Sequence, residues 1–273
     1  MAEPPRLRAE GLTKTFPGRS GGGPVRALDG VDLAVVPGEF VSIVGPSGCG
    51  KSTLFNLLAG LDPPSAGRIL LDGQPAELLG AIGYMPQADL LMPWRTVLDN
   101  AALGLQLDGV SRREARGRAR SELPRFGLAG FEDAWPSQVS GGMRQRAALL
   151  RTFLAGHDVM LLDEPFAALD EQTRLLLGDK VLQIHHALQQ TTLLITHNLT
   201  EAVQLSDRVL VMTYRPGRLK RAVAIDLPHP RDSEVVSSAA FGHFVAEIWQ
   251  DLREEASRGI EDAESRVRQQ GTR

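Results

Sequence analysis

The stretch Gly-Pro-Ser-Gly-Cys-Gly-Lys-Ser at residues 45–52 fits the phosphate-binding pattern G-x-x-x-x-G-K-[ST] and decides the fold of this chain. An apolar run at 40–44 precedes it, and a helical pattern over 51–59 follows it and ends at Gly60. Strand, glycine-rich loop and helix in this order form the context in which the pattern holds phosphates. The sequence therefore predicts a site for a nucleoside triphosphate at the start of this helix.

Each part of the loop has a predicted task. Glycines let the backbone curl so that its N–H groups surround phosphate oxygens, and the helix adds the positive end of its dipole. We expect Lys51 to neutralise the β- and γ-phosphates, Ser52 to bind Mg²⁺ and Thr53 to bond the α-phosphate. Cys49 is expected to be a small filler. The predicted nucleotide-binding residues here are Gly45, Pro46, Ser47, Gly48, Cys49, Gly50, Lys51, Ser52 and Thr53.

Two carboxylates follow the apolar strand predicted at 159–162. Strands often end in solvated acids, so this pair is informative only together with the phosphate loop. In that context Asp163 is expected to hold Mg²⁺, usually through water. Glu164 is expected to polarise the attacking water as a general base.

A second glycine-rich stretch, Ser140-Gly141-Gly142, opens a helix predicted over 140–155. Its first turn is almost bare of side chains, and a bare helix N-terminus favours anions. Taken singly, the stretch is more typical of a simple N-cap, for which serine is a favoured residue. The Gln145-Arg146 pair that follows, and the order of all the motifs, favour the anion site.

Composition limits the remaining possibilities. The 273 residues are 42% hydrophobic and 23% charged, and the net charge of −3 gives no electrostatic case for a nucleic-acid partner. The single cysteine excludes an intrachain disulfide. The N-terminus lacks a secretory pattern, and no apolar run approaches the roughly 18 residues that span a bilayer. We expect the protein to stay in the cytosol. If it works at a membrane, another subunit is expected to anchor it there.

The course of the chain predicts an α/β protein. Strands are expected at 7–16, 31–35, 69–71 and 81–85, and apolar runs at 159–162, 193–196 and 208–212 suit a parallel sheet covered on both faces. A helical block, with a capping box at Ser111, separates the two halves of the sheet. In the tail, 241–253 suits an amphipathic helix, and 257–273 is expected to be frayed or disordered.

The ordered set of motifs resembles the nucleotide-binding subunits of ABC transporters over about residues 5–225: it comprises 45–52, Gln87, 140–146, 163–164, 168–170 and His197. The resemblance implies a P-loop (RecA-like), mostly parallel sheet core with an antiparallel β subdomain and an inserted α-helical subdomain. We expect residues 1–86 and 156–225 to form the nucleotide-binding core with its N-terminal β subdomain. Residues 87–155 would form the helical subdomain, and 226–273 the tail.

The resemblance also implies residue roles. Gln87 looks like the lid glutamine that touches Mg²⁺ and the attacking water, His197 like the switch histidine at the γ-phosphate, and Asp170 like the aspartate that reaches across the dimer. Phe16 is similar in position to the aromatic residue that stacks on adenine. The full implied set is: catalytic, Glu164, His197, Gln87 and Lys51; metal, Ser52, Gln87 and Asp163; further nucleotide contacts, Phe16, Ser140, Gly141, Gly142, Gln145 and Asp170.

Some of these residues have plainer interpretations. Phe16 could be core, Gln87 a surface residue, and His197 a packed histidine after a buried strand. Val139 replaces the leucine usual before Ser-Gly-Gly, and Asn198 replaces an aspartate frequent after the histidine in importers.

The segments 90–100, 215–217 and 228–232 resemble the ATPase subunits of nitrate/sulfonate/taurine-type importers, a group that includes transporters of pyrimidine vitamin precursors. This implies ATP and Mg²⁺ as cofactors, a head-to-tail homodimer or dimer of ATPase subunits, and membrane permease subunits contacting the Gln87–Trp94 region. A periplasmic solute-binding protein would act indirectly, and the chain would lie at the cytoplasmic face of the bacterial inner membrane.

Three alternatives remain. A soluble ABC-type ATPase acting on DNA or the ribosome usually carries a long coiled coil or two nucleotide domains in one chain, and the sequence shows neither. A nucleotide-sensing regulator with little turnover would not need Glu164. A small kinase with the same phosphate loop would leave the Ser140 segment unexplained.

Overall fold

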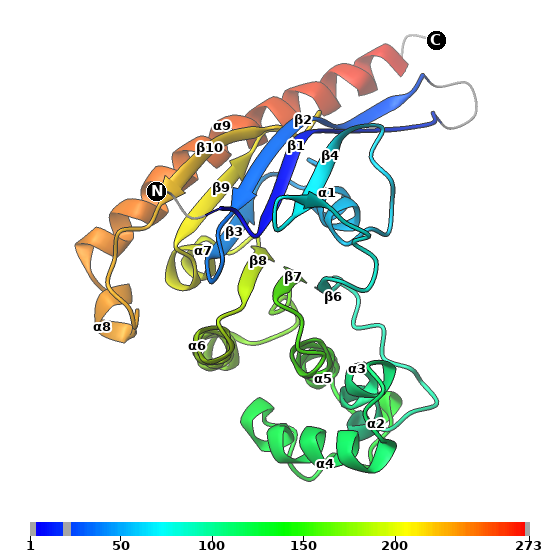
Figure 1. Ribbon diagram of the computed structural model, residues 1–273. Helices are drawn as coiled ribbons and strands as arrows, with labels where there is room; N and C mark the ends of the chain where they lie inside the picture. Colours follow the sequence, from blue (N-terminus) through cyan, green and yellow to red (C-terminus); the bar gives the residue numbers. More distant parts are fainter. Residues whose placement is uncertain (1–3, 19–22, 271–273) are drawn as a thin grey trace.

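The computed structural model describes residues 4–18 and 23–270, with side chains described as far as Gly259 and that of Glu261. Two sheets and their helices build the molecule (Figure 1). The helices within residues 97–122 lie at one end of the molecule, away from the antiparallel strands of residues 7–35. The predicted fold class, with a mostly parallel core, an antiparallel sheet and an inserted helical block, is confirmed.

The N-terminal sheet is antiparallel, with the order β2-β1-β4-β5. Along β1 and β2, residues that face the core alternate with exposed ones, which is the pattern of a sheet covered on one face. Its strands are β1 (Leu7–Phe16), β2 (Val25–Val35), β4 (Ala66–Leu71) and β5 (Gln74–Pro75).

The larger sheet has six strands in the order β10-β9-β3-β8-β7-β6, and every neighbouring pair except β10–β9 is parallel. Every residue of β3, β7 and β8 is buried, which explains why these strands are mostly apolar. The strands are β3 (Phe40–Val44), β6 (Gly83–Met85), β7 (Val159–Asp163), β8 (Thr191–Ile195), β9 (Arg208–Met212) and β10 (Leu219–Ala224).

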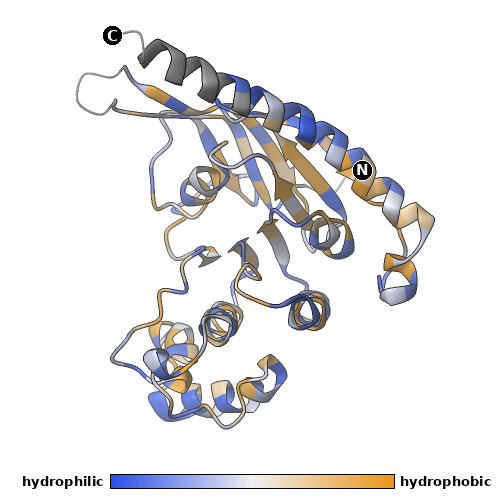
Figure 2. Cartoon of the chain, turned by 180° about the vertical axis from the view of Figure 1, so that it is seen from behind, coloured by the Kyte–Doolittle hydropathy of each residue, from blue (hydrophilic) through white to orange (hydrophobic). Residues whose placement is uncertain are grey.

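Helices cover the parallel sheet on both faces. One apolar core joins β1, β2 and α1 to one face of the sheet, and another joins α5, α6 and the helices after β6 to the opposite face. Figure 2 shows hydrophobic residues along the strands and in stripes on the helices. The helices are α1 (Lys51–Leu58), α2 (Val97–Ala101), α3 (Leu103–Leu107), α4 (Arg112–Glu122), α5 (Gly141–Leu154), α6 (Glu171–Leu188) and α7 (Leu199–Leu205), with 3₁₀ turns at Leu123–Phe126 and Pro136–Gln138.

The C-terminal segment differs from its prediction. After α8 (Ser233–Val236), α9 (Ala239–Gln270) is one helix of 32 residues, so the expectation of disorder from residue 257 is wrong as far as Gln270; residues 271–273 lie outside the described part. Phe241 and Ile248 are buried against α7 and β9. Beyond them, Arg258 pairs with residues three and four positions earlier, which supports the helix where apolar contacts thin out. Among the described residues, no helix has the length and apolarity needed to cross a membrane.

Candidate functional site

A cleft of about 460 Å³ lies at the N-terminus of α1, between the phosphate loop and the β1–β2 hairpin. It is lined on the loop side by the residues expected to hold phosphates and on the hairpin side by apolar residues. The lining comprises Phe16, Val25, Ala27, Ser47, Gly48, Gly50, Lys51, Ser52, Thr53, Gln87, Glu164 and Arg215. Gly45, Pro46 and Cys49 belong to the same loop but do not line the cleft.

The phosphate loop needs its glycines for steric reasons. Gly50, the N-cap of α1, has a φ of 108°, and a Cβ there would lie 2.9 Å from the carbonyl oxygen of Ala27. A Cβ at Gly45 would lie 2.9 Å from the buried Sγ of Cys49, which fits the filler role predicted for this cysteine. The loop is therefore packed tightly from behind, with its open side toward the cleft.

Lys51 lies across this loop. Its Nζ donates to the carbonyl oxygens of Gly45, at 2.7 Å, and Pro46, at 3.0 Å. Both acceptors are neutral, so the ammonium charge has no ion-pair partner within 4 Å in the described part of the chain. A phosphate group is a stronger partner for this cation than either carbonyl.

Asp163 ends β7 beside the loop and is almost fully buried. Burial raises the pKa of its carboxyl, and the charge of Glu164 raises it further, whereas a hydrogen bond from Ser52 and the charge of Lys51 act in the opposite direction. The Ser52 hydroxyl and the Asp163 carboxyl thus lie together, as two oxygen ligands next to the place where phosphates would lie. Oxygen donors in this number, completed by phosphates and water, are the set that Mg²⁺ takes.

Two other residues predicted to be catalytic, Gln87 and His197, contact Glu164. Its Oε2 accepts a hydrogen bond from Gln87 Nε2 at 3.1 Å and lies 3.4 Å from His197 Nδ1. Glu164 has a φ of 50°, and its N–H donates to Ile195 at the end of β8. Strained backbone of this kind is frequent at functional sites. The structure therefore gathers a carboxylate, an amide and an imidazole at the edge of the cleft.

The Ser140 segment lies elsewhere. Ser140 caps α5 and accepts from the N–H of Met143 at 3.2 Å, as a simple N-cap would. The amides of Gly141 and Gly142 donate no hydrogen bond within the described part of the chain. None of the three residues lines the cleft; Gly141 borders a second hollow together with Gln87 and Arg144. In a single chain the structure does not bring this segment to the phosphate loop.

Gln145 is placed differently from its predicted role as a nucleotide contact. It is buried, its Nε2 donates to the carbonyl oxygen of Glu164 at 2.9 Å, and its Oε1 accepts from the N–H of Ala168 at 2.8 Å. Both ends of the amide therefore bind the segment after β7 of the same chain. Gln145 therefore links α5 to that segment through two hydrogen bonds.

Two arginines of α5 were not anticipated. Arg144 Nε pairs with the Asp89 carboxylate at 3.0 Å. Arg151 donates to the carbonyl oxygens of Asp89 and Leu90, each at 2.8 Å. The segment that follows Gln87 is therefore bonded to α5. The spacing of seven residues places both arginines on one face of a helix, but the sequence gives no sign of their partner.

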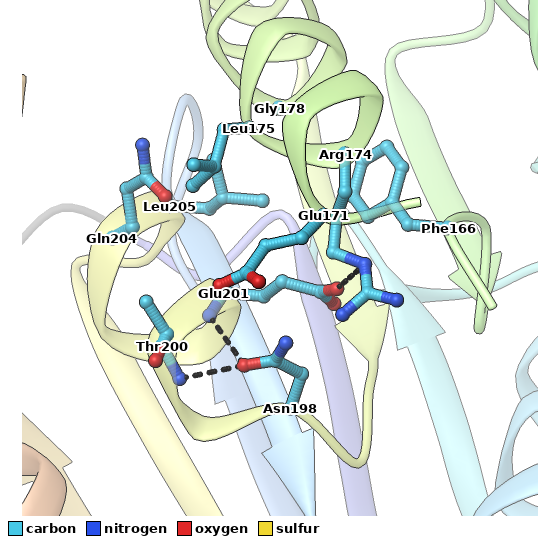
Figure 3. A pocket seen from close by; sticks show the side chains of 10 residues that line it. All are labelled: Phe166, Glu171, Arg174, Leu175, Gly178, Asn198, Thr200, Glu201, Gln204 and Leu205. Carbon is cyan, nitrogen blue, oxygen red and sulfur yellow. Dashed lines mark hydrogen bonds and ion pairs between the residues drawn. The ribbon is translucent and has the colours of Figure 1, made fainter. Parts of the chain in front are cut away.

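Asp170 is the exposed N-cap of α6, and hydrogen bonds from the N–H and hydroxyl of Thr173 lower the pKa of its carboxyl. One turn later, Arg174 Nη2 donates to the carbonyl oxygen of Leu169 at 3.1 Å, and its Nε lies 3.2 Å from the Glu201 carboxylate. Figure 3 shows the Arg174 side chain reaching from α6 to Glu201 on α7.

Glu201 continues this chain of contacts toward His197. Its Oε2 accepts from the hydroxyl of Thr196 at 2.5 Å, and that hydroxyl in turn accepts from the N–H of Asn198. Asn198, for which the sequence gave no role, caps α7 through its side chain (Figure 3). A mostly buried network therefore joins the Asp170 loop to the residues on both sides of His197.

The hairpin side of the cleft carries Phe16, whose side chain is partly exposed. The Lys14 ammonium lies 5.1 Å from the centre of its ring, an arrangement in which a cation is attracted to the ring face. Phe16 therefore lines the cleft rather than filling the core.

Arg215 is a further cleft residue that the sequence did not identify as one. It lies in the turn between β9 and β10, and its Nε donates to the carbonyl oxygen of Gly48 at 2.7 Å. In the sequence, residues 215–217 stood out only for their resemblance to importer ATPases, and the packing of this turn on the phosphate loop shows where the guanidinium lies.

Comparisons with known proteins agree with this geometry. A family model described as ABC transporter matches residues 28–167, slightly more than half of the chain. An uncharacterised ABC transporter ATP-binding protein of Methanocaldococcus jannaschii is 46% identical over 247 residues, covering 90% of this chain and 92% of that protein. A nitrate import ATP-binding protein of Synechocystis sp. is 43% identical, with 81% of this chain and 83% of that protein covered. A taurine import ATP-binding protein of Burkholderia pseudomallei is 42% identical, with coverages of 81% and 85%.

A solved structure extends the likeness to the fold. A dimeric ATP-binding cassette in a post-hydrolysis state, bound to ADP and phosphate, is 30% identical and has a TM-score of 0.74. The match covers 81% of this chain and all of that chain. Both the sequence and the fold therefore assign this chain to the ABC transporter family, as one of its ATPase subunits, which couple ATP hydrolysis to transport.

Proposed function

We propose that this chain is the ATPase subunit of an importer that takes up a small solute of the nitrate/sulfonate/taurine or pyrimidine-precursor type. Relatives named for nitrate and taurine import, at 42–45% identity, support the direction and the solute class. The solute itself would be chosen by the permease and by a periplasmic solute-binding protein, because the cleft of this chain suits a nucleotide.

The observation that carries the proposal is a site divided between two places. The cleft holds Lys51, Ser52 and Glu164, whereas the bare N-terminus of α5 at Ser140 and Gly142 lies outside it. Two copies arranged head to tail would bring each α5 N-terminus to the nucleotide of the other copy. The positive end of the helix dipole would then face the γ-phosphate.

The residues of the cleft divide the work. Ser52 and Asp163 would hold Mg²⁺, which would supply positive charge to the phosphates of the bound nucleotide. Glu164 accepts a proton from the attacking water as general base, and Gln87 orients Glu164 through the 3.1 Å hydrogen bond. His197, beside the same carboxylate, contacts the γ-phosphate. Phe16 stacks on adenine, and Asp170 reaches the partner copy.

A third hollow, more apolar than the nucleotide cleft, suits the membrane partner. It measures about 570 Å³ and lies beside the segment after Gln87, between β6 and the helices α3 and α5. Leu79, Leu90 and Leu107 line it and are each at least 60% exposed, and Trp94 nearby is 69% exposed. Exposed apolar residues gathered in one place mark an interaction surface. We assign this surface to a permease segment at the cytoplasmic face of the bacterial inner membrane.

The test is reconstitution with permease subunits of this importer type. Transport of the solute into vesicles should require ATP, and Leu107→Asp should abolish co-purification with the permease while leaving ATP binding intact. Leu176→Asp is the matched control, because Leu176 is also an exposed leucine but lies on α6. ATP turnover stimulated by nucleic acid, without any effect of the permease, would instead support the soluble ATPase.

A further inference from the structure

We propose that Arg215 is a binding residue of the cleft and that its guanidinium pairs with the phosphate chain of the nucleotide. The proposal rests on the assignment of the cleft as the ATP site. Arg215 lines that cleft together with Ser47, Gly48 and Lys51, although it lies more than 160 residues further along the chain.

The position of the guanidinium is the first step. Arg215 Nε donates to the Gly48 carbonyl at 2.7 Å, and Nη2 lies 2.7 Å from the place a Cβ would occupy at Gly48. The guanidinium therefore lies directly on the loop that surrounds phosphates. The Nε contact leaves the Nη groups available, and these donors form the fork that matches phosphate oxygens.

The charge of Arg215 is the second step. Its hydrogen-bond partner is a neutral carbonyl, and within the described part of the chain no carboxylate lies within 4 Å of its guanidinium. Arg218, in the same turn, is instead paired with Asp29. Lys51 and Arg215 are thus two cations that contact the phosphate loop through neutral partners, and a triphosphate supplies negative charge for both.

The turn that carries Arg215 is fixed on the cleft side. Gly217 donates to the Ala27 carbonyl at 2.9 Å, and its own carbonyl accepts from the N–H of Asp29 at 3.1 Å. A Cβ at Gly217 would lie 2.1 Å from the carbonyl oxygen of Cys49, so only glycine permits this approach. The turn therefore packs on β2 and on the phosphate loop at once.

The same turn is fixed from behind by α9. The N–H of Tyr214 donates to Glu255 at 3.0 Å, and Glu255 is 1% exposed although it is a charged residue. Lys220 on β10 and Arg258 on α9 compensate its charge, at 3.3 and 2.9 Å. A buried carboxylate held in this way fixes the backbone next to Arg215, so binding loses little conformational freedom there.

Arg215→Gln is the principal variant, because glutamine retains an N–H donor for Gly48 and removes the charge. Arg215→Lys retains the charge without the fork, and Arg218→Gln is the matched control. Dissociation constants for ATP, ADP and adenosine would be measured by calorimetry at low salt, with the melting temperature of each variant as a check on folding.

We expect Arg215→Gln to raise the dissociation constants of ATP and ADP about tenfold and to leave that of adenosine unchanged. Arg215→Lys should lie between this variant and the parent, and Arg218→Gln should match the parent. Unchanged ATP affinity, or an equal loss for ATP and adenosine, would overturn the proposal, because either result assigns Arg215 a purely structural role.

Lys51→Ala separates this proposal from the site on which it rests. Loss of ATP binding in Lys51→Ala, with normal binding in Arg215→Gln, would overturn the role of Arg215 and leave the cleft as the ATP site. Normal ATP binding in both variants would overturn the assignment of the cleft itself.

Discussion

The N-termini of α1 and α5 are both glycine-rich helix starts, yet their surroundings differ. Around α1, the chain itself supplies Lys51, Ser52 and Asp163 and a cleft in which phosphates fit. Around α5, the amides of Gly141 and Gly142 donate no hydrogen bond within the described residues, and neither residue lines the cleft at α1. The local sequence makes both helix N-termini attractive to anions, but only the N-terminus of α1 is surrounded by further phosphate-binding groups of the same chain. The difference fits the proposal that another copy completes the second.

The largest effect is expected at the carboxylate between the two regions. Glu164→Gln removes the proposed base but retains an acceptor oxygen, so ATP turnover should fall by about 10²–10⁴-fold. ATP binding should persist, and a stable dimer should appear on a sizing column with ATP. Glu77→Gln, in an exposed loop, is the control and should behave as the parent. Near-normal turnover in Glu164→Gln would assign the proton transfer to another group.

A charge placed at the α5 N-terminus tests the second region. Ser140→Arg should abolish turnover and spare ATP binding by the single chain, because the arginine would block contact with the partner's nucleotide. The substitution also removes an N-cap, at a cost of about 1 kcal/mol in stability. Ser111→Arg removes the same kind of cap from α4 and controls for that cost. Loss of ATP binding in Ser140→Arg alone would mean that Ser140 serves the site of its own chain.

The Arg174–Glu201 contact should have a smaller effect, because it acts through the positions of other residues. Arg174→Ala would leave Glu201, whose burial raises the pKa of its carboxyl, without its cation and would loosen the link from Leu169 to Thr196. We expect turnover to fall about tenfold with little change in ATP affinity. Arg118→Ala breaks an exposed ion pair on α4 and is the control. Equal turnover in the two variants would show that the link does not serve hydrolysis.

A change in stability, with no effect on the site itself, is expected in the core behind both regions and needs no second copy. His185 on α6 is buried against β3 and β8, and burial, followed by the neighbouring His186, lowers its pKa to about 4. Between about pH 6.5 and pH 4 the His185 imidazole binds a proton in the unfolded chain but stays neutral in the folded chain. The free energy of unfolding should therefore decrease as the pH is lowered through this window, by about 3 kcal/mol in total.

Urea unfolding followed against pH checks this expectation. In His185→Gln the acid-induced loss over this window should shrink, whereas His243→Gln, at an exposed site on α9, should retain it. An unchanged pH profile in His185→Gln would show that other groups cause the loss.

The sequence predicted those parts of the molecule that depend on neighbours in the chain. The phosphate loop, the strands of the parallel sheet and the N-cap at Ser111 follow from spacing alone. Gln145 and Arg215 did not, because their partners lie 19 and 167 residues away and only the packing decides which groups they reach. The length of α9 was missed for a related reason: ion pairs, and not an apolar face, support the part around Arg258.

Mixing two inactive variants tests the divided site most directly. In a head-to-tail pair of a Lys51→Ala chain and a Ser140→Arg chain, one site carries both defects and the other carries neither. The account predicts that ATP turnover, absent from each variant alone, reappears in the mixture and rises with protein concentration. A mixture as inactive as its components would contradict a site shared between two copies.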